Sequence, residues 1–142
     1  MYVLDTNVVS ELMKEKPDPT VLETLVALPE DAQFTTAMSE AEIFGGVARL
    51  PHGRRRQSLH DAASRLFDED FEGRVLPFDS ASARVYSQVV AERRNAGRSV
   101  EGFDLLIAAI ARCHGAVVVT RDRNGFADTG VETLDPWSRR LH

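Results

Sequence analysis

The sequence predicts an α/β fold, in which helices cover a mainly parallel β-sheet. Residues 2–4 and 116–119 are short, apolar segments with β-branched side chains, which is typical of strands buried on both faces of a parallel sheet. The segments between them carry apolar residues at spacings of three and four, the period of a helix with one buried face. Strands that alternate with helices favour an α/β sandwich.

The other elements follow in chain order. Weaker strand candidates, the last of them an edge strand, lie at 33–36, 74–76 and 131–134. Helices are expected at 6–13, 19–28, 39–50, 54–71, 80–96 and 101–114. Asp18 and Asp79 are candidate N-caps, and Gly97 and Gly115 lie where C-caps belong. Pro51, in the segment 50–53, should divide one helical region into a hairpin.

Length and composition indicate a single globular domain over residues 1–142, because a chain of this length buries a real core but is too short for two domains. No apolar run reaches the roughly 18–20 residues that span a bilayer, and the N-terminus lacks the features of a signal peptide. We therefore expect a cytoplasmic protein that does not contact membranes. Cys113 is the only cysteine, which excludes an internal disulfide, and we expect it to be buried as a small apolar side chain.

The net charge of -5 argues against a protein that coats nucleic acid through bulk electrostatics. It does not exclude a nuclease. Acidic residues gathered at a metal site lower the net charge, while arginines elsewhere on the surface can still hold phosphates.

Acidic residues follow both of the strong strand candidates. Asp5 comes directly after residues 2–4, and Asp122 comes after Thr120 and Arg121 at the end of the late strand. Ligands of open α/β sheets bind beyond the carboxyl ends of the strands, so these two side chains should emerge at the same edge. Two other roles remain open: Asp5 as the cap of the first helix, and Asp122 as a solvated turn residue.

Asp104 lies near the start of the expected 101–114 helix, whose following residues are almost entirely apolar. A lone buried carboxylate would cost several kcal/mol or take up a proton, so a metal ion or a buried cation is implied. Lys14 and Lys16 are the only lysines, and both are far away in sequence. The alternative is a first-turn aspartate that interacts with the helix N-terminus.

Glu42 is the fourth candidate acid. The apolar residues Ile43 and Val47 place the buried stripe of its helix beside it, which favours Glu42 over the neighbouring Glu40. The alternative is a capping box, in which Glu42 reaches back to a helix cap at Ser39.

Together the four acids make a chemically coherent set. Carboxylate oxygens suit Mg²⁺ or Mn²⁺, which are held by a few carboxylates, waters and substrate phosphate. One such ion can activate a water for in-line attack on phosphorus, and a second can neutralise the leaving oxygen. The histidines show no zinc-like spacing with the cysteine, so we interpret them as surface residues: His52, His60, His114 and His142.

Four motifs in order resemble the PIN-domain ribonucleases: Val-Leu-Asp5-Thr6-Asn7, a helical glutamate at 42, Asp104-Leu-Leu-Ile-Ala-Ala, and Val-Val-Thr120-Arg121-Asp122. The similarity covers nearly the whole chain and is strongest to the VapC toxins of type II toxin-antitoxin modules, especially the FitB-like branch. The ending 130–137 is similar to that branch too. One departure stands out. Many relatives read Thr-Arg-Asn, two residues and Asp-Phe, whereas this chain has its acid three places earlier and Gly125 before Phe126.

The resemblance implies a PIN-like three-layer α/β/α sandwich with about five parallel strands, and magnesium-dependent endonucleolytic cleavage of RNA. It also implies a homodimer and a VapB-type antitoxin, with which the toxin forms a heterooligomer on operator DNA. Carried over to this sequence, the metal-binding and catalytic residues are Asp5, Glu42, Asp104 and Asp122. The residues that contact these acids or the substrate are Asn7, Ser39, Thr120 and Arg121.

The arginines are clustered, and we hypothesise that some of Arg54, Arg55 and Arg56 contact RNA together with Arg121. Arg93 and Arg94 follow Glu92, and we expect them to be solvated and paired with nearby acids.

Single residues argue against two rival functions. A haloacid-dehalogenase-like phosphatase has a second acid where this chain has Asn7, and a receiver domain needs a late lysine that this chain lacks. A catalytically silent RNA-binding or partner-binding domain remains open.

Overall fold

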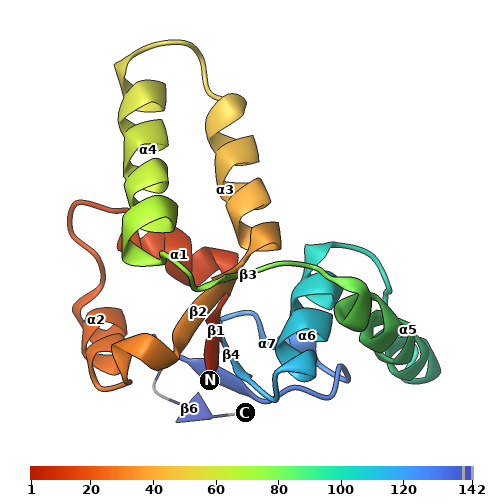
Figure 1. Ribbon diagram of the computed structural model, residues 1–142. Coiled ribbons are helices and arrows are strands. Elements are labelled where there is room, and N and C mark those ends of the chain that lie inside the picture. Colours follow the sequence, from red (N-terminus) through yellow and green to blue (C-terminus); the bar gives the residue numbers. More distant parts are fainter. Residues whose placement is uncertain (139, 142) are drawn as a thin grey trace.

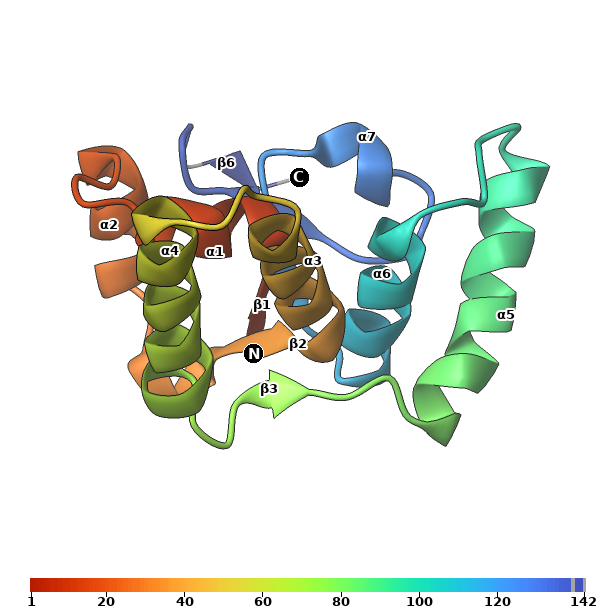
Figure 2. The ribbon, with the colours of Figure 1, turned by 90° about the horizontal axis from the view of Figure 1, so that it is seen from above.

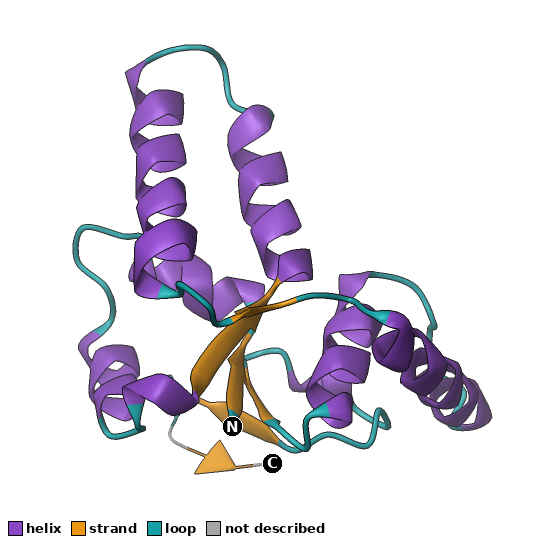
Figure 3. Ribbon diagram, viewed as in Figure 1, coloured by secondary structure: helices purple, strands orange, loops and turns teal. Residues whose placement is uncertain are grey.

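A computed structural model of the chain describes residues 1–138 and 140–141. Its parallel sheet has the order β3-β2-β1-β4-β5 and consists of β1 (Tyr2–Leu4), β2 (Gln33–Thr36), β3 (Val75–Leu76), β4 (Val117–Val119) and β5 (Thr133–Asp135). A short strand, β6 (Arg140–Leu141), pairs antiparallel with β5 at the edge of the sheet (Figure 3). The expected mainly parallel sheet of about five strands is confirmed.

The helices are α1 (Thr6–Leu12), α2 (Pro19–Val26), α3 (Ala37–Ala48), α4 (Arg54–Arg65), α5 (Ser80–Asn95), α6 (Phe103–Cys113) and the short α7 (Arg123–Phe126). Asp18 caps α2 and Asp79 caps α5 through their side chains, as the sequence predicts. Pro51 lies between α3 and α4, which form the expected hairpin (Figure 1). No helix among the described residues is long and apolar enough to cross a membrane.

Alternation along the strands divides the apolar side chains between two cores. Val3 and Val118 pack with α5, α6 and α7, whereas Leu4 and Val119 pack with α1 to α4. Successive side chains of a strand point to opposite faces, so each strand contributes to both cores. Figures 1 and 2 show the result, with α2 and α4 on one side of the sheet and α5 and α6 on the other. The three-layer sandwich follows directly from this alternation.

Helix α6 is buried on most of its circumference, as its sequence predicts. The residues from Ile107 to Ala111 are all fully buried. Cys113 is partly exposed, so the expectation that it is buried was wrong. It is the last residue of α6, and the exposed His114 and Gly115 follow it, so the chain is already leaving the core there.

The segment expected to form one helix over 54–71 differs from the prediction. Helix α4 ends at Arg65, and a π-helical turn, Leu66–Asp70, follows it. The amide of Phe71 donates to the carbonyl of Leu66 at 2.9 Å, five residues earlier. This wider turn places Leu66, Phe67 and Phe71 in one core. Apolar spacing predicted the buried residues, but the change in hydrogen bonding has no sequence period of its own.

The carboxyl ends of β1 and β4 lie side by side in the middle of the sheet. Leu4 is in register with Val119, and the amide of Asp5 donates to the carbonyl of Val119 at 3.0 Å. The hairpin of α3 and α4 rises beyond this end of the sheet (Figure 1). Residues that follow β1 and β4 therefore lie together at the carboxyl edge of the sheet, where ligands of α/β proteins commonly bind.

Candidate active site

The four acids predicted from the sequence meet at one cavity. The cavity has a volume of about 290 Å³ and is lined by Asp5, Thr6, Asn7, Ser10, Glu42, Asp104 and Asp122. The acids come from different elements: Asp5 from the end of β1, Glu42 from α3, Asp104 from α6, and Asp122 from the turn after β4. Residues separated by more than a hundred positions are thus brought together by the parallel sheet.

Asp5 both caps a helix and lines the cavity. Its Oδ1 accepts a hydrogen bond from the amide of Thr6 at 2.8 Å, and its Oδ2 accepts one from the hydroxyl of Thr120 at 2.8 Å. Only 4% of Asp5 is exposed. Burial raises the pKa of this carboxyl to about 6, and the charges of Glu42 and Asp122 add to the rise. The two hydrogen bonds act in the opposite direction and lower the pKa. The capping role and the site role are therefore compatible.

Thr120 connects the residues after β1 with those after β4. Its fully buried hydroxyl donates to Asp5 Oδ2 and accepts from Asn7 Nδ2 at 3.1 Å and from the amide of Asp122 at 3.0 Å. The Oδ1 of Asn7 is buried and has no hydrogen-bond partner within the described part of the chain. An orphaned buried oxygen at an acid-lined cavity is a vacant acceptor for a water or a cation.

Glu42 reaches the cavity through Thr6. Its Oε1 accepts a hydrogen bond from the hydroxyl of Thr6 at 2.8 Å, and that hydroxyl also lies 3.0 Å from the Oγ of the buried Ser39. The capping box considered for Glu42 is wrong, because α3 begins two residues earlier and its cap is Thr36, whose side chain accepts from the amide of Ser39. Glu40 does not line the cavity.

Asp104 lies half-buried in the first turn of α6, and Asp122 is exposed at the start of α7. Burial, followed by the charges of Asp5 and Asp122, raises the pKa of Asp104 to about 7; a hydrogen bond with Asp122 and the charge of Glu42 add to this. The Oδ1 of Asp122 accepts from the amide of Gly125 at 3.0 Å. Asp122 is therefore an exposed turn residue, as the sequence also allowed. The same turn places its carboxyl at the cavity.

The donor set suits a divalent cation with a partly hydrated shell. No cationic side chain among the described residues forms an ion pair with any of the four acids. Within residues 1–138 and 140–141, no three acidic, histidine or cysteine side chains are already arranged as a complete group of metal ligands. Mg²⁺ usually keeps several waters and is bound through one or two carboxylates, so it needs no closed protein cage. The repelling acids and the orphaned Asn7 oxygen agree with such an ion.

Arg121 borders the site without entering the acid-lined cavity. Its guanidinium lies over the Trp137 ring, 3.6 Å from the centroid. A second cavity, of about 640 Å³, contains Arg98, Arg121 and Arg123 and shares Asp122 with the first. Arg54, Arg55 and Arg56 line neither cavity and lie at the start of α4. His52, His60 and His114 are exposed, as expected, while His142 lies outside the described residues.

A third cavity adjoins the acidic one at Glu42. It has a volume of about 700 Å³, shares Thr6, Ser10 and Glu42 with the acidic cavity, and is otherwise mostly apolar. Its lining includes Met13 from the end of α1 and Leu59 from α4.

Sequence reasoning missed three residues around the acids: Thr6, Gly125 and Arg93. Thr6 lies within the Asp5-Thr6-Asn7 motif, and its place between two site residues could have identified it. Gly125 was noted as a departure from relatives, but its contacts could not be foreseen. Arg93 was expected to be solvated and paired with an acid, which is wrong: only 7% of it is exposed, and its hydrogen bonds go to backbone carbonyls. Arg94 is exposed, as expected.

Comparison with known proteins agrees with this geometry. A family model described as "PIN domain" matches residues 2–132. The chain belongs to the PIN domain family. This PIN domain is 37% identical to the VapC ribonuclease Y4jK of Sinorhizobium fredii, with 96% of this chain and 98% of the relative covered. It is 34% identical to toxin FitB of Neisseria gonorrhoeae, with 96% and 99% covered.

The same PIN domain superposes on a chain in a structure of FitAB bound to a DNA fragment, with a TM-score of 0.87 and 34% identity over 96% of each chain. The resemblance to PIN-domain proteins and to the VapC and FitB toxins, first indicated by the motifs, is confirmed.

Proposed function

We propose that this chain is a metal-dependent endoribonuclease and the toxin of a type II toxin-antitoxin module, with residues 1–142 acting as one domain. The observation that carries the proposal is the meeting of four carboxylates, from four separate elements, at one cavity. The similarity to a protein named as a VapC ribonuclease supports RNA as the substrate. Cleavage of cellular RNA would take place in the cytoplasm.

In this proposal Asp5, Glu42, Asp104 and Asp122 bind Mg²⁺, or Mn²⁺ in its place. The bound ion would supply activation of water and neutralisation of charge on the scissile phosphate. Of the other residues, Thr120 fixes the Asp5 carboxyl by a 2.8 Å hydrogen bond, and Thr6 fixes Glu42 by another. Ser39 and Asn7 support these two contacts.

Protons compete with the cation for the same oxygens. The raised pKa values, about 7 for Asp104 and about 6 for Asp5, mean that these acids take up protons as the pH falls through this range when no cation balances them. Metal affinity, and with it cleavage, should therefore rise with pH through this range.

We also propose that the RNA backbone lies along the second cavity, over Arg121 and Arg123, with the scissile phosphate near Asp122. Support comes from the shared wall between this cavity and the acidic one. The stacking of Arg121 on Trp137 holds the guanidinium plane and leaves its edge N–H groups as donors. Arg54 to Arg56 line neither of these two cavities, so we do not place the RNA path over them.

A salt titration of RNA binding by the Asp5→Asn protein separates these two arginine groups. Replacing Arg121 and Arg123 by alanine should weaken binding and flatten its salt dependence, whereas replacing Arg54 and Arg55 should change neither. The reverse pattern would move the RNA path to the α3–α4 hairpin.

The partner is proposed to be a VapB-type antitoxin, in a heterooligomer that binds operator DNA and contains a toxin homodimer. The similarity to a chain in the DNA-bound FitAB structure supports this. The mostly apolar third cavity, which shares Glu42 with the acids, is where such a partner would block the site. We expect a small antitoxin gene immediately upstream of the toxin gene, and its co-expression should give a complex without nuclease activity.

One experiment tests the function and identifies the target together. RNA 5′ ends are sequenced after expression of the wild type and of Asp5→Asn, whose amide keeps an acceptor for the Thr6 cap. We expect new ends only with the wild type. Identical ends from both proteins would favour a catalytically silent binding domain, which is the second candidate. The phosphatase alternative finds no support, because the Asn7 amide is hydrogen-bonded to Thr120 where a second acid would be needed.

A further inference from the structure

The turn after β4 carries the acid whose position departs from many relatives. Asp122 caps α7, a single turn that also contains Gly125. The Gly125 amide donates to Asp122 Oδ1 at 3.0 Å. The position of this carboxyl therefore depends on how α7 packs against the rest of the site.

Gly125 lies next to the carboxylates of two of the acids. A Cβ atom built on Gly125 would stand 2.6 Å from Asp122 Oδ2 and even closer to Asp104 Oδ2, although real Cβ atoms essentially never approach within 3.0 Å. Both oxygens thus converge on the space that a side chain at position 125 would fill. The backbone gives no other reason for glycine here, because Gly125 is not among the glycines with positive φ.

We propose that Gly125 is a positioning residue of the acidic site, whose missing side chain provides the space in which the carboxylates of Asp104 and Asp122 meet and bind one divalent ion together. The inference rests on the proposed function, because it assumes that these acids bind a metal. It also explains the departure in the sequence: with the acid at 122, position 125 must be small.

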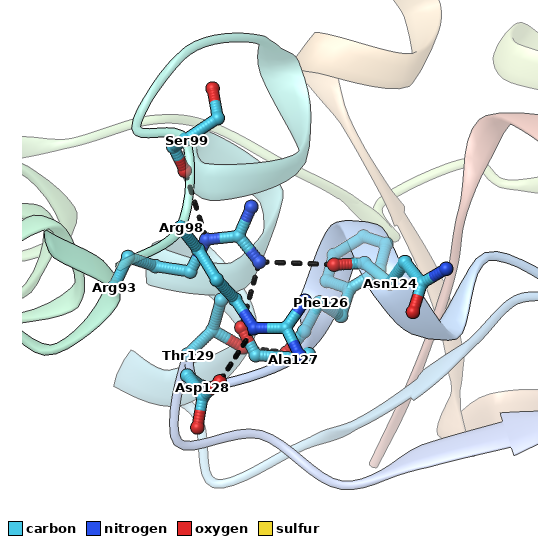
Figure 4. A network of polar contacts seen from close by, with 8 residues as sticks. All are labelled: Arg93, Arg98, Ser99, Asn124, Phe126, Ala127, Asp128 and Thr129. Carbon is cyan, nitrogen blue, oxygen red and sulfur yellow. Dashed lines mark hydrogen bonds and ion pairs between the residues drawn. The ribbon is translucent and has the colours of Figure 1, made fainter. Parts of the chain in front are cut away.

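Arg93, from α5, holds the same turn in place. Its Nη1 donates to the carbonyls of Asn124 and Ala127 at 3.0 and 2.8 Å, and its Nε donates to the carbonyl of Ser99 at 3.0 Å (Figure 4). Asn124 and Ala127 lie on either side of Gly125 and Phe126, so a buried guanidinium fixes both ends of the segment. Hydrogen bonds from a charged donor are about twice as strong as neutral ones, which suits a clamp on so short a helix. Arg93 is therefore the second positioning residue of Asp122.

Titration calorimetry of Mn²⁺ into the metal-free protein tests the role of Gly125. Gly125→Ala should bind Mn²⁺ more weakly, on the order of 10- to 100-fold, the usual effect of losing support for metal ligands. Its melting temperature without metal should change little, because the atoms that must move aside are the ends of two side chains and no positive φ is involved. The matched control is Gly45→Ala in α3, where a Cβ meets nothing within 4 Å and Mn²⁺ binding should match the wild type.

Arg93→Met provides a second, independent variant. Loss of the clamp should weaken Mn²⁺ binding as well as lower the melting temperature, since it removes the hydrogen bonds that the guanidinium donates to three backbone carbonyls. Val89→Ala is the control for lost stability alone, because Val89 is buried in the same helix α5 and its apolar side chain donates no hydrogen bond to the α7 segment. At a temperature where both variants remain folded, Val89→Ala should bind Mn²⁺ normally and Arg93→Met should not. Arg93→Lys, which keeps the charge, should recover part of the affinity.

The outcomes separate this inference from the proposed function. If the wild type binds Mn²⁺ and Gly125→Ala binds it equally well, the positioning role is wrong while the metal site stands. If Arg93→Met and Val89→Ala lose Mn²⁺ affinity to the same extent, the clamp is only structural and that part of the inference is wrong. A wild type that binds no Mn²⁺ would reject the proposed function itself.

Discussion

Replacing Asp104 by asparagine should make the metal-free protein more stable at alkaline pH. Asp104 is half-buried near Asp5 and Asp122, and its pKa is raised from 3.8 to about 7. The folded state therefore resists ionisation of this carboxyl more than the unfolded state does. For a raised carboxyl pKa, stability is lost as the pH increases from about 4, where the unfolded chain ionises, to about 7, where the folded protein does. Asparagine removes that loss.

The expected gain is moderate. One pKa unit corresponds to about 1.4 kcal/mol, so the full shift would give about 4 kcal/mol for a completely buried group. Asp104 is only half-buried, and water screens its repulsion, so we expect about 1–2 kcal/mol near pH 8. In a domain of this size such a change raises the melting temperature by about 3–6 °C. Near pH 4 the gain should be close to zero.

Thermal unfolding followed by circular dichroism measures this, with EDTA-treated protein at a series of pH values. Asp68→Asn, at an exposed position of the π-helical turn, is the matched control and should show no such growth with pH. Adding Mn²⁺ near pH 8 should stabilise the wild type and leave Asp104→Asn almost unchanged, because the variant has lost a ligand. A stability difference that does not change with pH would contradict the raised pKa that burial and the neighbouring acids give Asp104.

Three further changes have expected outcomes. Asp79→Ala removes the carboxyl that caps α5 by accepting hydrogen bonds from the amide and hydroxyl of Ser82, which lower the pKa of Asp79. The variant should melt at a lower temperature than the wild type at neutral pH, and this difference should shrink as the pH falls through the lowered pKa. Ile107→Ala opens a cavity in a fully buried helix face and should lower the free energy of unfolding by about 2–5 kcal/mol in urea denaturation. Thr120→Val removes the hydroxyl that holds Asp5 and should weaken Mn²⁺ binding, measured by calorimetry, on the order of 10- to 100-fold. An unchanged transition or affinity in any of these would contradict the role given to that side chain.

The elements that were predictable from sequence are those fixed by local periodicity and by the geometry of parallel strands. Asp5 and Asp122 follow apolar strands, and the shared carboxyl edge of a parallel sheet brings them together without further information. Asp104 was identifiable because a charge in an apolar helix needs compensation. Glu42 had two interpretations, because a glutamate near a serine also matches a helix start. The Thr36 cap of α3 and the contact of Glu42 with Thr6 decide between them.

What could not be predicted depends on contacts between distant segments. The burial of Arg93 requires the carbonyls of Asn124 and Ala127, about thirty residues later, so the run of charged residues around it looks like a solvated face. In the sequence, Gly125 cannot be distinguished from an ordinary turn glycine, because its role depends on the two carboxylates that lie next to it in the fold. Both residues support the acids rather than belong to them, and such support has no local signature in a single sequence.

Cleavage of RNA by the purified protein is the most direct measurement of the proposed activity. Total RNA is incubated with the wild type in Mg²⁺, in EDTA, and with Asp104→Asn in Mg²⁺, and the product ends are quantified by sequencing. We predict cleavage at defined sites by the wild type in Mg²⁺, none in EDTA, and none by the Asp104→Asn protein, which should still melt cooperatively. Equal cleavage by Asp104→Asn, or cleavage that persists in EDTA, would contradict a metal-dependent site built on these four acids.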